Sequence, residues 1–181
     1  EDLIPENNET IQLTLSNPSN TTISDATGAV VITDDDGIKW DTNTLTTSAD
    51  GAYDVHVADM DNDGDMDIVA SSIHDDTIRW FESNGNINPT FTVATIATNA
   101  DHVREITVAD MDHDGDLDIL SASENDGSIA WYENNGAADP TFTKAVITTS
   151  AVGAQDVQVA DIDGDGDLDI VSASSLDDTI A

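Results

Sequence analysis

Short runs of apolar residues, separated by polar and glycine-rich stretches, set the pattern of this chain. Val55 and Val57 flank His56, and the same alternation returns at 106–108. A period of two is typical of a β-strand with one buried face. The continuous apolar run at 68–70 favours a strand that is buried on both faces. Since no window shows a sustained helical period, we expect an all-β fold.

The same pattern predicts two more strands in each part of the chain. One is expected at 77–82 and ends at Asn84-Gly85, a dipeptide that favours a tight hairpin. Another is expected at 91–97, just after Pro89, where no backbone donor to a sheet is needed. We therefore expect four short antiparallel strands in each repeating unit.

An acidic motif recurs along the sequence with a fixed period. It reads VADMDNDGDMDIVASS from Val57, VADMDHDGDLDILSAS from Val108 and VADIDGDGDLDIVSAS from Val159, 51 residues apart each time. Trp80 and Trp131 keep the same spacing outside the motif. Four short strands at this period favour a β-propeller blade over a helical solenoid. The predicted blades cover about 40–90, 91–141 and 142–181, the last one incomplete.

Within each motif, aspartates alternate with other residues. Numbered from the first aspartate, carboxylates occupy positions 1, 3, 5, 7 and 9, and glycine occupies position 6. Alternate residues direct their side chains to one side of the backbone, and the glycine permits a sharp turn that brings later groups to the same point. Ca²⁺ takes six to eight oxygen ligands in forgiving geometry, whereas Mg²⁺ demands a near-ideal octahedron. Softer metals prefer His or Cys, and His113 in the second motif is interpreted as a solvent-facing spacer.

We therefore predict one Ca²⁺ in each acidic loop, three in all. Positions 1, 3, 5 and 9 are expected to bind through carboxylates and position 7 through its backbone carbonyl. The predicted metal ligands are Asp59, Asp61, Asp63, Asp65 and Asp67 in the first loop, Asp110, Asp112, Asp114, Asp116 and Asp118 in the second, and Asp161, Asp163, Asp165, Asp167 and Asp169 in the third.

The acidic loops admit two other readings. An EF-hand needs a glutamate at position 12 and flanking helices, but position 12 is alanine or serine here and strands are expected on both sides. A solvated acidic turn needs no metal at all. Three loops in one register argue against that reading.

The composition agrees with a cation-holding protein. Lys and Arg total 4 and Asp and Glu total 38, for a formal net charge of −34. Such charge repels nucleic acid and anionic membranes, so neither is expected as a partner. Strong acidity also fits disorder, but 38% of the residues are hydrophobic and lie in strand-like runs. The absence of cysteine excludes disulfides and thiolate metal sites, and no stretch approaches the roughly 20 apolar residues of a membrane span.

The acidic motif, the following DIVASS and the segments TIRWFESNG and SIAWYENNG resemble the FG-GAP/VCBS repeats of integrin-α-like β-propellers and large bacterial surface proteins. The resemblance covers about 40–181. It implies a propeller, usually of seven blades, with calcium in each acidic loop. Because three blades do not close such a ring, we expect further blades of the same protein or other copies of the chain as partners.

The first 37 residues look different. PENNETIQLTLSNPSN followed by GAVVITDDDG resembles the final strands of a Calx-β domain, a calcium-binding β-sandwich. That resemblance implies a partial sandwich at 1–37 and further calcium there, with a solvated acidic linker as the other reading. Its acidic ligands fall on Glu6, Glu9, Asp34, Asp35 and Asp36.

These observations lead us to expect a secreted, calcium-stabilised structural or adhesive module of a bacterial surface protein or filament. Its ligand is expected to be a cell-surface protein or a glycan. The alternatives are a lectin-like propeller, with sugars stacked on Trp80-Phe81 and Trp131-Tyr132, or an accessory region of a secreted hydrolase. We expect no enzyme activity, because the sequence has no G-x-S-x-G, no cysteine nucleophile and no phosphate loop. His56, His74 and His102 are interpreted as surface residues.

Overall fold

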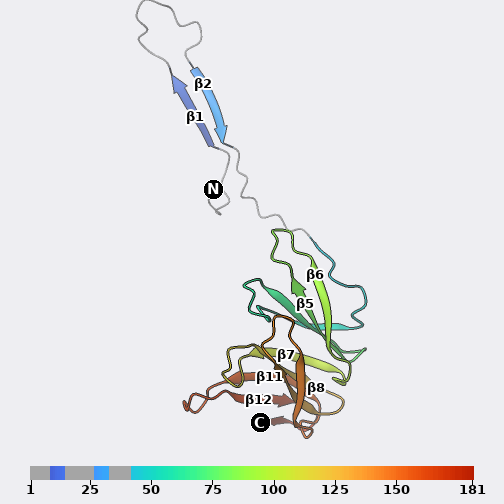
Figure 1. The fold of residues 1–181 in the computed structure, drawn as a ribbon. Helices are drawn as coiled ribbons and strands as arrows, with labels where there is room; N and C mark the ends of the chain where they lie inside the picture. The colour runs from blue at the N-terminus through green and yellow to red at the C-terminus, as the bar shows by residue number, and fades with distance from the viewer. Residues whose placement is uncertain (1–8, 15–26, 33–41) are drawn as a thin grey trace, which may run out of the picture. The chain divides into compact units, whose positions relative to one another are not determined.

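The fold is taken from a computed structural model that describes residues 9–14, 27–32 and 42–181 (Figure 1). The chain divides into two compact units, 1–44 and 45–181. In its described residues there is no helix of the length and apolarity that crossing a membrane requires.

The described residues of the first unit include one antiparallel strand pair. Strand β1 (Glu9–Thr14) pairs with β2 (Thr27–Ile32), with Glu9 opposite Ile32. Glu9 is thus the first residue of a strand, of which only the backbone is described. The other predicted ligands of the Calx-β-like segment lie outside the described residues. These are Glu6, Asp34, Asp35 and Asp36.

The second unit consists of three antiparallel sheets. The first sheet has the order β3 (Ala52–Ala58), β4 (Asp67–Ser72), β5 (Thr77–Ser83) and β6 (Phe91–Ala97). The second has β7 (Val103–Ala109), β8 (Asp118–Ser123), β9 (Ser128–Asn134) and β10 (Phe142–Thr148). The third has β11 (Ala154–Ala160), β12 (Asp169–Ser174) and β13 (Thr179–Ile180). The expected all-β fold with sheets of four antiparallel strands is confirmed.

The boundaries of the observed sheets are offset from the boundaries of the repeats counted in the sequence. They span 52–97, 103–148 and 154–180, so the fourth strand of each complete sheet comes from the start of the next counted repeat. The turn between β5 and β6 also differs from expectation. Pairing stops at Ser83 and resumes at Phe91, so the predicted tight hairpin at Asn84-Gly85 is wrong. The Asn84 side chain accepts a hydrogen bond from the Thr90 N–H at 3.1 Å and thereby closes a longer loop.

Neighbouring sheets bury their facing sides against each other. Between the first and second sheets, Val69 and Trp80 pack with Ile106 and Tyr132. Between the second and third sheets, Leu120 and related residues pack with Val157 in a second core. The first strands β3, β7 and β11 of the three sheets lie in contact in that order. The repeat therefore stacks sheet on sheet, in keeping with blades.

The apolar side of β3 is an exception to this burial. Val55 and Val57 are 61% and 62% exposed, whereas Ile106 and Val157, which occupy the place of Val55 in the next two sheets, are fully buried. The expected burial of Val55 and Val57 is thus wrong in the first sheet. The reason is that each equivalent residue is covered by the preceding sheet, and residues 42–181 contain no sheet before this one.

Candidate functional site: three acidic loops

Each acidic loop connects the first strand of a sheet to the second. In the first sheet the strands end with Ala58 paired to Asp67, so position 9 of the loop is already the first residue of β4. The same pairing joins Ala109 to Asp118 and Ala160 to Asp169. The flanking strands fix both ends of the loop, which is the β-strand context that the sequence predicted.

The first two loops bring the carboxylates of positions 1, 3 and 5 together. Ligand oxygens of Asp59, Asp61 and Asp63 lie within 4.8 Å of one another, as do those of Asp110, Asp112 and Asp114. Backbone donors hold the curl, since Asp59 accepts hydrogen bonds from the Asp63 N–H at 3.1 Å and the Gly64 N–H at 3.0 Å. The arrangement offers a compact group of oxygens to a hard cation.

The third loop gathers a different set. Oxygens of Asp161, Asp163 and Asp169 lie within 4.8 Å of one another, and Asp169, the first residue of β12, is partly buried. Here the position-9 carboxylate joins positions 1 and 3, while Asp165 is outside the group. Several acidic triads that could hold a metal ion are therefore present, one in each loop.

In the first two loops the position-9 aspartate is a buried brace. Asp67 is 1% exposed. Its Oδ1 accepts a hydrogen bond from the Ser83 N–H at 2.7 Å, and its Oδ2 accepts from the Met60 N–H at 3.2 Å and from Trp80 Nε1 at 3.0 Å. Asp67 thus ties the loop to the core between the first two sheets. Its predicted role as a direct ligand stays a prediction.

Asp118 repeats this brace in the second loop. It accepts hydrogen bonds from the Asn134 N–H at 2.8 Å and the Met111 N–H at 3.1 Å. Burial raises the pKa of Asp118, although these two donors act in the opposite direction. The buried carboxylate is therefore supported by backbone donors and not by a basic side chain.

The position-7 side chains lie away from the triads. The Asp65 carboxylate sits against Gly85 and the Asp116 carboxylate against Gly136, so closely that a Cβ on either glycine would collide with it. Both glycines also have a positive φ, near 63° and 64°. The repeated Asn-Gly dipeptide therefore makes room for an aspartate. The predicted carbonyl ligation by position 7 remains untested.

Two left-handed backbone positions shape each loop. The predicted glycine at position 6 has φ 95° at Gly64 and 100° at Gly166. Position 4 is left-handed as well, at Asn62 with φ 59° and His113 with φ 60°. Sequence reasoning missed this second position, although Asn, His and Gly at one site of a repeat are residues enriched at positive φ.

Position 4 also joins neighbouring loops. Asn62 Nδ2 donates a hydrogen bond to Asp116 Oδ1 at 2.8 Å, and His113 Nε2 lies 2.8 Å from the Gly166 carbonyl oxygen, which accepts from it. His113 is exposed, as expected for a solvent-facing residue. It is more than a spacer, because its side chain links the second loop to the third.

Among the described residues, no arginine or lysine forms an ion pair with an aspartate of the acidic loops. Burial raises the pKa of Asp61, and the negative charges of Asp63, Asp67 and Glu82 raise it further. In the described part of the chain, the arginine ion pairs are Arg79 with Asp75 and Arg104 with Glu124, both outside the loops. A bound cation would relieve this repulsion.

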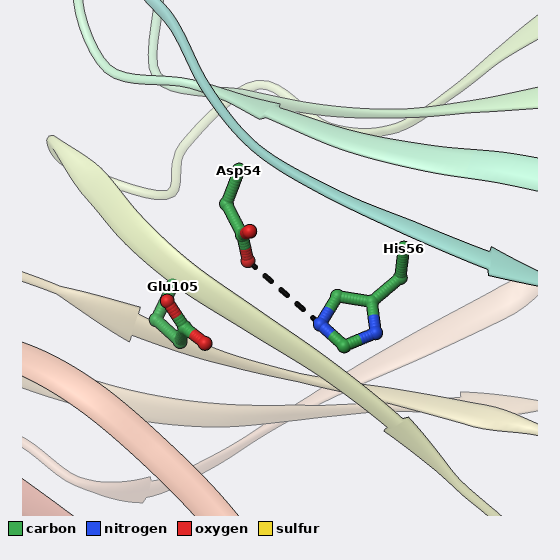
Figure 2. Close-up of side chains that lie close together, drawn as sticks. All are labelled: Asp54, His56 and Glu105. Carbon is green, nitrogen blue, oxygen red and sulfur yellow. Dashed lines mark ion pairs between the residues drawn. The ribbon is translucent and has the colours of Figure 1, made fainter.

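A second type of cluster lies on the first strands of the sheets (Figure 2). Asp54 and His56 of β3 meet Glu105 of β7, with ligand atoms within 4.8 Å of one another. Burial raises the pKa of Glu105 to about 7, helped by the charges of Asp54 and Asp156. Sequence reasoning missed this site, although Asp54, Glu105 and Asp156 share the 51-residue register.

This fold and its loops define a repeat protein built of antiparallel sheets, two of four strands and one of three in the second unit, each with an acidic loop after its first strand. A family model for the FG-GAP-like repeat matches residues 69–121 and 111–172. These segments cover more than half of the chain, which therefore belongs to the FG-GAP-like repeat family. The second and third loops fall within the matches, and the first follows from the repeat register. A search of curated proteins found no match.

Proposed function

We propose that this chain is a calcium-stabilised structural and adhesive module of an extracellular protein, with one Ca²⁺ in each acidic loop. FG-GAP-like repeats are typical of extracellular proteins. The observation that carries the proposal is the triad of carboxylates, with oxygens within 4.8 Å, that recurs in all three loops.

The donor chemistry supports calcium over other metals. The triads offer only carboxylate oxygens, which suit hard cations. The predicted further oxygens are those of positions 7 and 9 in the first two loops and of positions 5 and 7 in the third, with position 7 binding through its backbone carbonyl. Ca²⁺ accepts six to eight ligands in irregular geometry. Asp61 illustrates the electrostatic benefit, because the cation would offset the burial and the like charges that raise its pKa.

The proposed role of the ion is structural. Each loop joins two strands of one sheet, and the first two loops each contact the loop of the next sheet, so a metal that orders the loops would order the stack. If each site binds near ~10 μM and the medium holds ~1 mM Ca²⁺, binding stabilises the fold by about 2.7 kcal/mol per site. Three sites would add roughly 8 kcal/mol, which is comparable with the stability of an ordinary domain.

The exposed apolar faces of the first and third sheets support the proposal that the partners of this chain are built of the same repeat. On the first sheet, Val55 is exposed where Ile106 is buried; on the third, Ile180 is 74% exposed where Ile129 is buried. Each face has the pattern that the adjoining sheet covers elsewhere in the stack. Further blades of the same protein, or other copies of the chain, would bury these faces.

Most of the aromatic residues considered for sugar stacking are buried. Trp80, Phe81 and Tyr132 are at most 2% exposed, so they cannot stack on a sugar from solvent, whereas Trp131 is only partly buried. The burial of the first three favours a packing role in and between the sheets.

The proposal is tested by calcium titration and melting of the chain. We expect about three Ca²⁺ bound by the second unit in isothermal titration calorimetry, and a melting temperature that falls sharply when a chelator is added. Asp112→Asn should remove one binding event, while Asp139→Asn, outside the loops, should leave all of them. A melting temperature insensitive to chelator would overturn the proposal.

A further inference from the structure

We propose that Asp54, His56 and Glu105 form a binding site for a first-row divalent transition-metal ion, separate from the acidic loops. Zn²⁺ is the natural probe for such a site. The site lies between the first strands of the first and second sheets (Figure 2). The inference goes beyond the proposed calcium function and does not depend on it.

The geometry of the cluster suits a small metal ion. One ligand atom from each of the three residues lies within 4.8 Å of the others, and His56 Nε2 is 3.9 Å from Asp54 Oδ2. Ligands of a tetrahedral zinc at about 2.0–2.2 Å from the metal lie roughly 3.3–3.6 Å apart. Small side-chain rotations close that gap, and all three residues are only partly buried, which leaves room for them.

Irregularities in the strand pairing position the carboxylates of Asp54 and Glu105. The strand pairing shifts register between Ala52 and Val55 in the first sheet, and between Val103 and Glu105 in the second. Such bulges redirect side chains. Asp54 is further fixed by hydrogen bonds from the Val55 N–H at 2.8 Å and the Ile106 N–H at 2.9 Å. An ionised carboxylate has about four lone-pair sites, so acceptor capacity remains for a metal.

In the part of the chain that the structure describes, no arginine or lysine forms an ion pair with this cluster. Burial and the charges of Asp54 and Asp156 act on Glu105, with no hydrogen bond to its carboxylate to counter them. Among the described residues the arginine ion pairs go to other carboxylates. His56 is thus the one basic group in the cluster, and its neutral ring is a metal ligand.

The imidazole separates this site from the calcium loops. A donor set of one ring nitrogen and two carboxylate oxygens favours zinc-like ions over Ca²⁺ and Mg²⁺. The residues in the place of His56 are Thr107 in the second sheet and Gln158 in the third, which offer no such nitrogen. The stoichiometry should therefore be one ion per chain, although the carboxylate positions recur three times.

The test is a Zn²⁺ titration of the whole chain after metal removal, in an excess of Ca²⁺ to fill the acidic loops. We expect one Zn²⁺ per chain, with affinity reduced at least about tenfold by His56→Gln and by Glu105→Gln. His74→Gln is the control, because His74 belongs to a different histidine-containing place: its Nδ1 is 3.3 Å from Asp50 Oδ1, and its ring lies 6.2 Å from the ring of His102 between centroids. That variant should bind Zn²⁺ like the parent chain.

A second measurement distinguishes direct binding of Zn²⁺ to His56 from a loss of binding caused by misfolding of a variant. In histidine-ring NMR spectra, Zn²⁺ should shift the His56 nitrogen signals and leave those of His74 in place, and circular dichroism should show that each variant is folded. The proposal is overturned if excess Ca²⁺ abolishes Zn²⁺ binding, if His56→Gln binds Zn²⁺ like the parent, or if His74→Gln weakens binding equally. Failure of the calcium proposal would appear separately, in melts without Zn²⁺.

Discussion

Asn62 of the first acidic loop donates a hydrogen bond from Nδ2 to Oδ1 of Asp116 in the second loop, across 2.8 Å. The two residues are 54 positions apart in the chain. This contact joins two candidate calcium loops directly. Asn62 also holds a left-handed backbone position, so one residue shapes its own loop and links it to the next.

The two roles of Asn62 can be separated by substitution. Asn62→Gly keeps the left-handed backbone and removes the hydrogen bond, which should cost about 0.5–1 kcal/mol. Asn62→Ala removes the bond and adds about 1–2 kcal/mol of backbone strain. Urea denaturation in Ca²⁺ measures both variants. Equal stabilities for the two would contradict the assigned backbone role.

Asp67 should matter even when no metal is present. Asp67→Asn replaces an oxygen that accepts hydrogen bonds with an amino group that repels the same donors, in a buried place. We expect a loss of about 2–4 kcal/mol in unfolding free energy in chelator. Asp61→Asn, a triad position, should change stability little in chelator but reduce the gain on adding Ca²⁺. If Asp67→Asn matched the parent chain in chelator, the brace described above would be wrong.

Gly85 and Gly64 form a matched pair for substitution. Both have positive φ, but a Cβ on Gly85 would strike the Asp65 carboxylate, whereas one on Gly64 meets nothing within 4 Å. Gly64→Ala should cost about 1–2 kcal/mol from backbone strain alone. Gly85→Ala should cost more and should disturb the first loop. Denaturation and Ca²⁺ titration of both test this, and a smaller loss for Gly85→Ala would refute the steric role.

Glu105 should make stability fall as pH rises. Its pKa of about 7 in the folded chain is above the ordinary 4.5, so the folded state binds the extra proton between these values. The favourable contribution is complete below about 4.5 and is lost as pH rises through about 7. Asp54, Asp156 and His56 surround the group, and partial exposure to solvent limits the effect to on the order of 1 kcal/mol.

This pH effect is measured by comparing the parent chain with Glu105→Gln in chelator from pH 4.5 to 8. The variant should gain stability relative to the parent as pH rises, since its amide does not ionise. A constant difference across that range would show that Glu105 has an ordinary pKa.

The exposed face of the first sheet predicts unequal costs at equivalent positions. Ile106→Ala should lose about 2–4 kcal/mol, because it leaves a cavity between two sheets. Val55→Ala should change stability by no more than about 0.5 kcal/mol in dilute chain. At high concentration Val55→Asp should reduce self-association in analytical ultracentrifugation. A large loss from Val55→Ala in dilute solution would show that this face is already covered.

The strands and the loop positions could be predicted because their signals are local. Alternation marked β3, and β6 was predicted with its observed bounds, 91–97. The acidic spacing marked the triads and Gly64. Those features depend on residues close together in the chain, where strand period and turn chemistry act.

The missed features depend on contacts between distant segments. The Asn62 bond to Asp116 and the meeting of Asp54 with Glu105 each join separate sheets, so no local pattern reveals them. The exposure of Val55 was missed for a related reason. Val55 is apolar like its buried counterparts Ile106 and Val157, so the residue type does not distinguish them. Only the presence or absence of a neighbouring sheet decides whether the side chain is buried.

The two faces of each sheet are not alike. One face carries residues such as Leu120 and Ile129, and the opposite face carries residues such as Ile106 and Tyr132. A twofold dimer would place identical faces together and could not reproduce either core. If copies of the chain assemble through these faces, as proposed, they would have to join head to tail. A terminal sheet with a hydrophilic outer face would then stop growth at one end only.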